Sequence, residues 1–370
     1  VNAGDPLMLL LVFGMIVFGL VMIYSASSYT AGLQYGNAFY YVKRQIFTVI
    51  IGTVMMYMIS RPDYHRILKY AWPLYGIALL MLAAVFLIGT ASHGQKRWIY
   101  IGPVGFQPSE FTKFILIIFL AAMCSAAEPL MKKWKGIILM FLCVMPAAAM
   151  VMATNLSTGV IILGVSFIII FTASRKWAPF FALTGMGIAM MGVFLKLAAY
   201  RLDRIEAWLN VETHPKGYQT RQALFAIGSG GLFGCGYGKS IQKLAYVPEA
   251  HNDMIFAIIC EEWGLFGAII SILLFILLIW RCAVIAMAAP DLQGALFVTG
   301  VMAHIGLQMM INIAVVTNSI PNTGVPLPFI SYGGSSMISS LILAGLIIRV
   351  SVESNARTVY DARRRSFSHV

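Results

Sequence analysis

The chain has 370 residues, of which 60% are apolar and only 11% are charged, and its formal net charge is +12. Soluble domains carry about a quarter charged residues, so this composition excludes a cytosolic fold. Outer-membrane barrels are excluded as well, because their strands alternate in polarity, whereas the apolar segments here are continuous.

Apolar runs long enough to span a bilayer core of about 30 Å recur along the chain, which predicts an all-α polytopic integral membrane protein. We expect about ten transmembrane helices in a single transmembrane domain over residues 1–370. The predicted spans are 7–27, 45–60, 68–90, 111–127, 136–154, 156–173, 178–197, 255–280, 292–316 and 328–349. The first run lacks a small-residue cleavage site, so we expect it to be retained. The start at Val1 suggests a preceding cytoplasmic segment.

Basic residues in the short loops predict the orientation, because cytoplasmic loops are enriched in lysine and arginine. Fourteen such residues lie on one set of loops and five on the other, so the richer set is predicted to be cytoplasmic. Both termini then lie in the cytoplasm, which requires an even number of spans. The fourteen are Arg61, Arg66, Lys69, Lys132, Lys133, Lys135, Arg175, Lys176, Arg281, Arg349, Arg357, Arg363, Arg364 and Arg365.

The first polar stretch whose side chains could take part in binding or catalysis follows the third span. Pro108 suits the start of a helix, and Ser109 could cap it. Glu110 and Lys113 are three residues apart, so they share a helical face and can form an ion pair. Such a pair at the mouth of a span is either a structural latch or part of a substrate path.

A long extracytoplasmic loop, residues 198–254, is predicted between the seventh and eighth spans. Leu202, Ile205, Trp208 and Leu209 share a helical face, which predicts a short interfacial helix anchored by Trp208, and a second helical piece covers 219–227. The loop is rich in basic residues, which indicates an anionic ligand, with simple solvation of a large loop as the alternative. These residues are Arg201, Arg204, Lys216, Arg221, Lys239 and Lys243.

A glycine-rich run, residues 228–240, ends in Gly238-Lys239-Ser240 but does not match a phosphate-binding loop. That template needs a glycine five positions before Gly238, where Phe233 stands. We interpret the glycines as permitting tight turns and close approach to other elements. Further on, three prolines precede the last span and predict a rigid, broken start. His304 lies within an apolar run and is interpreted as a packed histidine.

Asp253 lies where the long loop meets the eighth span, within the stretch 248–256. A carboxylate at this depth is costly unless it is used or neutralised, so Asp253 either does chemistry or marks a helix end. All the polar constellations fall on the predicted outer side. A groove there, lined by lysine and arginine with a carboxylate at its edge, suits an amphipathic substrate with a phosphate head and a lipid tail.

Several of these stretches match the motifs of the SEDS proteins (shape, elongation, division and sporulation), the group of RodA, FtsW and SpoVE. The chain resembles this family over essentially its whole length. The matching stretches are 96–99, 106–113, 217–219, 226–234, 242–243, 248–253 and 326–336. Asn252 and Met254 depart from the usual pattern, but neither change removes an ionisable group. The 155–158 hairpin and the 248–251 stretch resemble the FtsW and SpoVE branch more than the RodA branch.

The resemblance implies a peptidoglycan glycosyltransferase of the bacterial cytoplasmic membrane, which polymerises lipid II at the outer face with inversion and release of undecaprenyl pyrophosphate. It implies Asp253 as general base or as ligand of a Mg²⁺ or Mn²⁺ ion. The implied partners are lipid II, undecaprenyl-linked glycan, membrane lipids and a class B penicillin-binding protein, with no nucleic acid. The residues expected to bind substrate are Lys96, Arg97, Glu110, Lys113, Arg204, Gln219, Arg221, Lys243, His251 and Ser331.

Two other functions are compatible with the composition. A lipid II flippase or transporter would also have about ten spans, but transporters place coupling charges near the membrane midplane, and here the charges cluster at the predicted outer ends. A division scaffold without activity of its own would leave Asp253 at a costly position without a reason. We therefore expect chemistry at the outer face.

Overall fold

The computed structural model describes residues 4–92, 95–101, 104–174, 176–181, 184–185 and 199–367 of the chain. Within these residues, nine helices are long and apolar enough to cross a membrane, and they correspond to nine of the ten predicted spans. They are α1 (Pro6–Tyr35), α2 (Tyr40–Ser60), α4 (Ala71–Ile88), α5 (Pro108–Ala126), α7 (Trp134–Thr154), α8 (Leu156–Ser174), α12 (Ile255–Met287), α13 (Leu292–Val316) and α14 (Gly334–Phe367). The predicted span 178–197 lies mostly outside the described residues.

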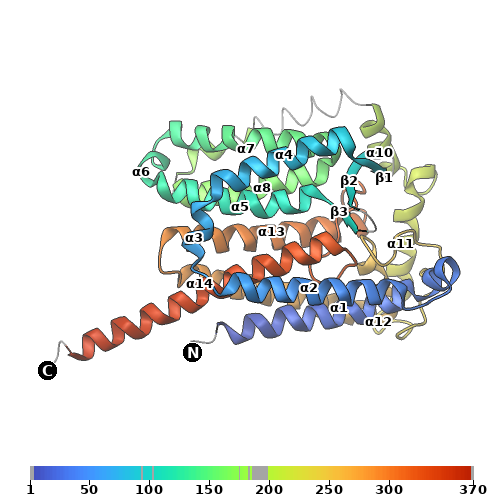
Figure 1. The fold of residues 1–370 in the computed structure, drawn as a ribbon. Helices are drawn as coiled ribbons and strands as arrows, with labels where there is room; N and C mark the ends of the chain where they lie inside the picture. The colour runs from blue at the N-terminus through green and yellow to red at the C-terminus, as the bar shows by residue number, and fades with distance from the viewer. Residues whose placement is uncertain are drawn as a thin grey trace.

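The long helices lie side by side in one bundle, with both chain ends at the same end of it (Figure 1). We call this the termini end; it also carries the short helices α3 (Tyr64–Lys69) and α6 (Glu128–Met131). The opposite end, here called the loop end, carries α10 (Ala199–Leu209), α11 (Tyr218–Gly230) and the three strands. The polar segments singled out in the sequence therefore gather at one end of the bundle.

A small antiparallel sheet at the loop end was not predicted from the sequence. It consists of β1 (Thr90–Ser92), β2 (Gln95–Ile101) and β3 (Val104–Phe106), with β2 in the middle. The segment is too short and too polar to span a membrane, and its strands satisfy their backbone groups by pairing with each other. β3 leads through Gln107 directly into α5, with Pro108 in the first turn, so Gln107 and not Ser109 occupies the N-cap position.

The start of the last long helix also differs from its prediction. α14 begins at Gly334 rather than at 328, because residues 318–333 form a turn-rich segment. Pro326 and Pro328 have no backbone N–H to donate, and Phe329 has a φ of 62° that no helix accommodates. The prolines thus delay the start of the last membrane helix, as the sequence indicated. Residues 318–333 lie before this helix, at the loop end.

Together with α14, α5 is one of the two most enclosed of the described membrane helices. In its membrane-spanning window 72% of the residues are buried, against 22% for α2, so α5 lies inside and α2 faces outward. Phe119 on α5 is fully buried, and the rings of Tyr75 and Trp72 pack on it at centroid distances of 4.4 and 5.0 Å. Because interiors are close-packed, α5 cannot shift without repacking its neighbours.

The glycine-rich run docks onto a kink in α12. Gly264 has a φ of 65° inside this helix, and a Cβ there would lie 2.5 Å from the backbone nitrogen of Gly234. Cys235 N donates to Glu261 O (2.9 Å), and Leu265 N donates to Gly231 O (2.9 Å). The prediction that these glycines permit close approach to another element is confirmed.

Two adjacent glutamates of α12 hold the following part of the loop. Glu261 accepts hydrogen bonds from the backbone nitrogens of Ile241 and Gln242 at 2.9 and 3.3 Å. Glu262 is fully enclosed and accepts from Lys243 Nζ and from Ser25 Oγ of α1, at 2.9 and 2.6 Å. Since a charge this deep needs a partner, the ion pair locks the loop to α12 and α1.

Another close contact joins α1 to the turn before α14. A Cβ at Gly19 would lie 2.7 Å from both the Cα and the carbonyl oxygen of Ile330. No side chain larger than hydrogen fits there without moving the backbone of one partner. The turn at 327–332 is therefore seated directly on α1.

We expect removal of the Lys243–Glu262 ion pair to lower the stability of the protein strongly. Lys243→Met leaves the Glu262 carboxylate buried without its cation, and breaking a buried pair in this way costs about 3–5 kcal/mol. Thermal unfolding of the purified protein in detergent should show a clearly lowered midpoint, while Lys239→Met, an exposed lysine of the same loop, should leave it unchanged. The double variant Lys243→Met/Glu262→Met should recover much of the loss. A wild-type midpoint for Lys243→Met would contradict the anchoring role.

Candidate active site

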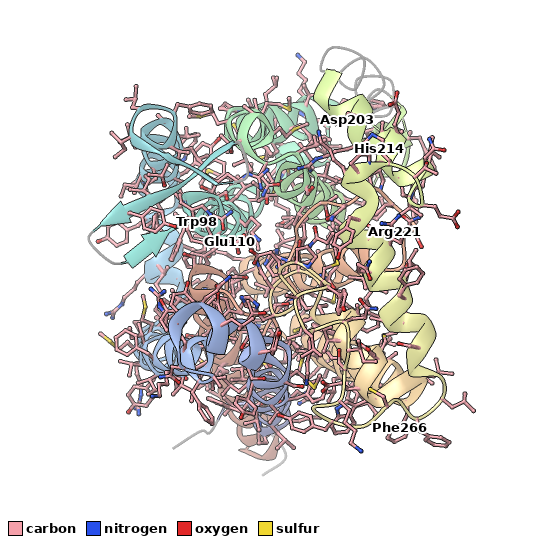
Figure 2. All side chains as sticks on the ribbon, turned by 90° about the vertical axis from the view of Figure 1, so that its right-hand side faces the viewer. Trp98, Glu110, Asp203, His214, Arg221 and Phe266 are labelled. Carbon is pink, nitrogen blue, oxygen red and sulfur yellow. The ribbon has the colours of Figure 1, made fainter. Side chains whose placement is uncertain are left out.

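A cavity of about 1210 Å³ opens at the loop end of the bundle. Its walls come from α2, β2, β3, α5 and α10 and from the segments 216–220, 249–253, 318–326 and 332–338. Figure 2 views the molecule from this end and shows Trp98 of β2 beside Glu110 of α5, both of which line the cavity. Segments that are far apart in the sequence therefore converge on one space.

Asp253 lines this cavity from the loop that precedes α12. Its side chain is 7% exposed, and a Cβ built at Gly324, across from it, would lie 3.5 Å from its Oδ2 atom. Burial, together with the neighbouring charge of Glu249, raises the pKa of Asp253 to about 7. A carboxyl group with a pKa near neutrality can take up and release a proton under physiological conditions.

Gln219 of α11 connects the two loops beside Asp253. Its Nε2 atom donates to Pro248 O at 3.1 Å and lies 3.5 Å from Asp253 Oδ1. Its Oε1 atom accepts from Asn322 Nδ2 at 3.0 Å. One side chain thus ties the Asp253 loop to the 318–326 segment and orients both toward the cavity.

Cations outnumber carboxylates around the cavity. The basic residues that line it are Lys43, Arg44, Arg97, Lys113, Arg204 and Lys216, and the acidic ones are Glu110, Glu249 and Asp253. Arg97 on β2 donates through Nε to Thr154 O at 2.8 Å, which fixes its position at the wall. Arg204 on α10 lies within 3.4 Å of Asn322 O. The net positive rim favours an anionic ligand.

The predicted Glu110–Lys113 ion pair is confirmed. Lys113 Nζ lies 2.9 Å from Glu110 Oε1, and both side chains are buried in the first turns of α5 at the floor of the cavity. Lys113 also donates to Gln308 Oε1 of α13 at 3.2 Å. The pair is therefore part of the packed core as well as of the cavity wall.

His251 and Ser331 have structural roles in the site, one through ring packing and the other through a hydrogen bond within a turn. The His251 ring packs between Tyr41 and Tyr332 at centroid distances of 4.2 and 5.3 Å, and burial lowers its pKa, so the imidazole is neutral. Ser331 Oγ accepts from Leu327 N at 2.8 Å and closes the turn before α14. His251 lines the cavity, and Ser331 lies behind its wall.

Three other residues expected to bind substrate do not contribute described side chains to the cavity. Lys243 is held by Glu262 and Ser25 inside the loop. Arg221 bonds to the backbone oxygen of Glu212 and lies on α11, on the opposite side of this face from Trp98 and Glu110 (Figure 2). Lys96 belongs to β2, but its side chain lies outside the described part of the structure.

Several cavity residues were missed by the sequence reasoning. Lys43 and Arg44 were counted only as loop charges, although they face the cavity from α2. Trp208 was expected to anchor in lipid headgroups, but its Nε1 atom donates to Asn318 O at 2.8 Å and its ring lines the cavity. Glu249 lies four residues before Asp253 in the same stretch, so the sequence offered it as a second carboxylate of the site.

Comparisons with known proteins agree with this arrangement. The family model of FtsW, RodA and SpoVE, described as "Cell cycle protein", matches residues 6–356. Stage V sporulation protein E of Bacillus subtilis is 37% identical over 95% of this chain and 97% of its own length. A probable peptidoglycan glycosyltransferase FtsW of Trichlorobacter lovleyi is 36% identical over 94% of this chain and 93% of its own.

Solved structures show the same architecture. A chain from a study of how a peptidoglycan synthase complex coordinates polymerization and crosslinking has a TM-score of 0.80, with 26% identity over 95% of this chain and 98% of its own. The rod shape determining protein RodA of Thermus thermophilus has a TM-score of 0.70, with 28% identity over 94% of this chain and 97% of its own. The chain is a multi-pass membrane protein of the FtsW, RodA and SpoVE family of cell cycle proteins.

Proposed function

We propose that the chain is a peptidoglycan glycosyltransferase that polymerises lipid II, with its loop end on the outer face of the cytoplasmic membrane and both termini in the cytoplasm. The observation that carries this proposal is the position of Asp253, a nearly buried carboxylate inside a wide cavity rimmed by cations. The excess of basic loop residues at the termini end supports the orientation.

The chemistry of the cavity wall fits each part of such a substrate. Pyrophosphate carries several negative charges, and Arg97 of β2, Lys113 of α5 and Arg204 of α10 supply cations to the cavity. Beside them α2 adds apolar side chains, and Phe47, which is 65% exposed, continues this wall toward the lipid. An undecaprenyl tail can therefore stay in the bilayer while the head group occupies the cavity.

In the proposed reaction, the 4-hydroxyl of the acceptor sugar attacks the anomeric carbon of the lipid-linked donor. Asp253 takes the hydroxyl proton as the new C–O bond forms. The bond between the anomeric carbon and the pyrophosphate oxygen breaks on the opposite face, so the configuration inverts and undecaprenyl pyrophosphate leaves with the electron pair. The basic rim stabilises the negative charge of the leaving group.

A divalent cation fits this donor set. Asp253 and Glu249 both present carboxylates to the cavity, and hard ions such as Mg²⁺ and Mn²⁺ prefer oxygen ligands. When bound, the ion would neutralise pyrophosphate charge. We also propose a class B penicillin-binding protein as partner, supported by the likeness to a chain of a peptidoglycan synthase complex that couples polymerization to crosslinking.

Removing the proposed base should abolish the reaction. Asp253→Asn keeps the shape of the side chain but cannot accept the proton, so polymerisation should fall by about 10²–10⁴-fold. The measurement is glycan-strand formation from lipid II by the purified protein with its class B partner, with Glu128→Gln at the termini end as control. Normal polymerisation by Asp253→Asn would refute the assignment. Translocation of labelled lipid II in liposomes without any polymer would indicate a flippase instead.

The rate should depend on pH in the direction set by the raised pKa of Asp253. Below about 7 the carboxyl is protonated and cannot act as base, so without added cation the rate should fall as the pH is lowered through 7. Mg²⁺ favours the ionised form and should move the inflexion to lower pH. The experiment is a pH profile of kcat at two Mg²⁺ concentrations. A flat profile across this range would exclude Asp253 as the titrating base.

The cation assignment predicts a contrast between the two ends of the molecule. Arg97→Gln should lower kcat by about 10²-fold, because a fixed positive group at the leaving pyrophosphate is lost. Lys132→Gln, just after α6, should have no effect, since this lysine is exposed, pairs with Glu128 and does not line the cavity. Steady-state kinetics on lipid II would measure both. Equal rates for Arg97→Gln and wild type would remove Arg97 from the site.

A further inference from the structure

One face of α13 carries three buried polar side chains that the proposed reaction does not use. His304, Gln308 and Asn312 are spaced four residues apart, so they lie in a row along the helix. Their exposures are 4%, 1% and 1%. Polar side chains inside a membrane helix are costly and usually have a functional reason.

Asn312 stands at the top of this row and holds two segments of the site. Its Nδ2 atom donates to Asp253 O and to Val325 O, both at 2.7 Å. A single amide therefore fixes the backbone of Asp253 relative to the 318–326 segment that faces it across the cavity. Asn312 itself does not line the cavity, so it has no direct access to the substrate.

Gln308 makes the equivalent connection one turn away. Its Nε2 atom donates to Pro326 O at 2.9 Å, and its Oε1 atom accepts from Lys113 Nζ at 3.2 Å. Val325 and Pro326 are adjacent, so the two amides of α13 bind consecutive carbonyls of the same segment. Because Asn312 also binds the backbone of Asp253 and Gln308 also binds the ammonium of Lys113, α13 fixes the distance between these two groups.

The row is not optimised for stability. His304 Nδ1 and Asn312 Oδ1 are buried and have no hydrogen-bond partner among the described residues, and the same holds for Glu110 Oε2 of the adjoining ion pair. Each such atom lowers the stability of the fold relative to a hydrogen-bonded one, because it loses its bond to water and gains none in the protein. Departures of this kind are expected where side chains are retained for the geometry of a site.

We propose that Asn312 and Gln308 are positioning residues for glycosyl transfer, which set the proposed base Asp253 and the proposed leaving-group cation Lys113 in register. This inference rests on the proposed function. It assigns no contact with the sugar to either residue. Their role requires the amide, because Asn312 must donate two hydrogen bonds and Gln308 must both donate and accept.

The test compares the steady-state kinetics and melting temperatures of purified variants on lipid II. Asn312→Leu keeps the branched shape of the side chain but loses both donations, and a displacement of about 1 Å at the reacting group can cost 10²-fold in rate. We expect kcat to fall by about 10–10²-fold with KM within about twofold, because the cavity wall is intact.

The matched control is Thr299→Val on the same helix, whose hydroxyl, within the described part of the structure, bonds only to Ala295 O of α13 itself. It should leave kcat, KM and the melting temperature unchanged. Gln308→Glu provides a second, independent variant that keeps the acceptor for Lys113 but loses the donation to Pro326. It should lower kcat at constant KM, and it decides the question should Asn312→Leu not fold.

The outcomes separate this inference from the proposed function. Wild-type kcat in both variants, or a loss of kcat accompanied by a raised KM and a lowered melting temperature, would overturn the positioning role. In that case an active wild type and an inactive Asp253→Asn variant still support the proposed reaction. A wild type that forms no polymer from lipid II would overturn the proposed function itself.

Discussion

The ion pair between Glu110 and Lys113 lies where the apolar core of the bundle meets the polar cavity. Both charges are almost completely withdrawn from water, so each depends on the other, and Lys113 depends also on the Oε1 atom of Gln308. α5 carries the pair in its first turns and is packed on all sides further down. Among the described membrane helices, α5 and α14 are the two most enclosed, so the cavity floor receives its charge from a deeply packed helix and its rim is built by loops.

The loops above this floor are likewise held by buried polar groups that pair with one another within the protein. Glu261 and Glu262 of α12 bind the loop at 241–243, Gln219 binds the Asp253 loop to the 318–326 segment, and Asn312 binds the same two segments from below. Lipid and core offer no water to satisfy these groups. The polar contacts that close the loop end consequently also set the geometry of the site.

The sequence predicts the helical spans well, because a continuous apolar run of sufficient length has few alternatives in a membrane protein. The Glu110–Lys113 pair was predictable since it depends only on helical spacing. The partners of Lys243 and Arg221 were not, because the sequence does not distinguish a basic residue that faces a ligand from one that faces a buried glutamate, as Lys243 does, or a backbone carbonyl, as Arg221 does. Gln308 and Asn312 were overlooked inside an apolar run. The strands at 90–106 gave no signal because their pairing is purely local.

The contact of Gly19 with Ile330 joins a membrane helix to the turn that carries Tyr332. Tyr332 in turn packs on His251 and donates its backbone N–H to His251 O at 3.0 Å, two residues before Asp253. A substitution at position 19 would therefore disturb the cavity rather than the surface of α1 that faces lipid. In a screen for loss of function, a residue deep in the first helix should fall into the same phenotypic class as residues of the site.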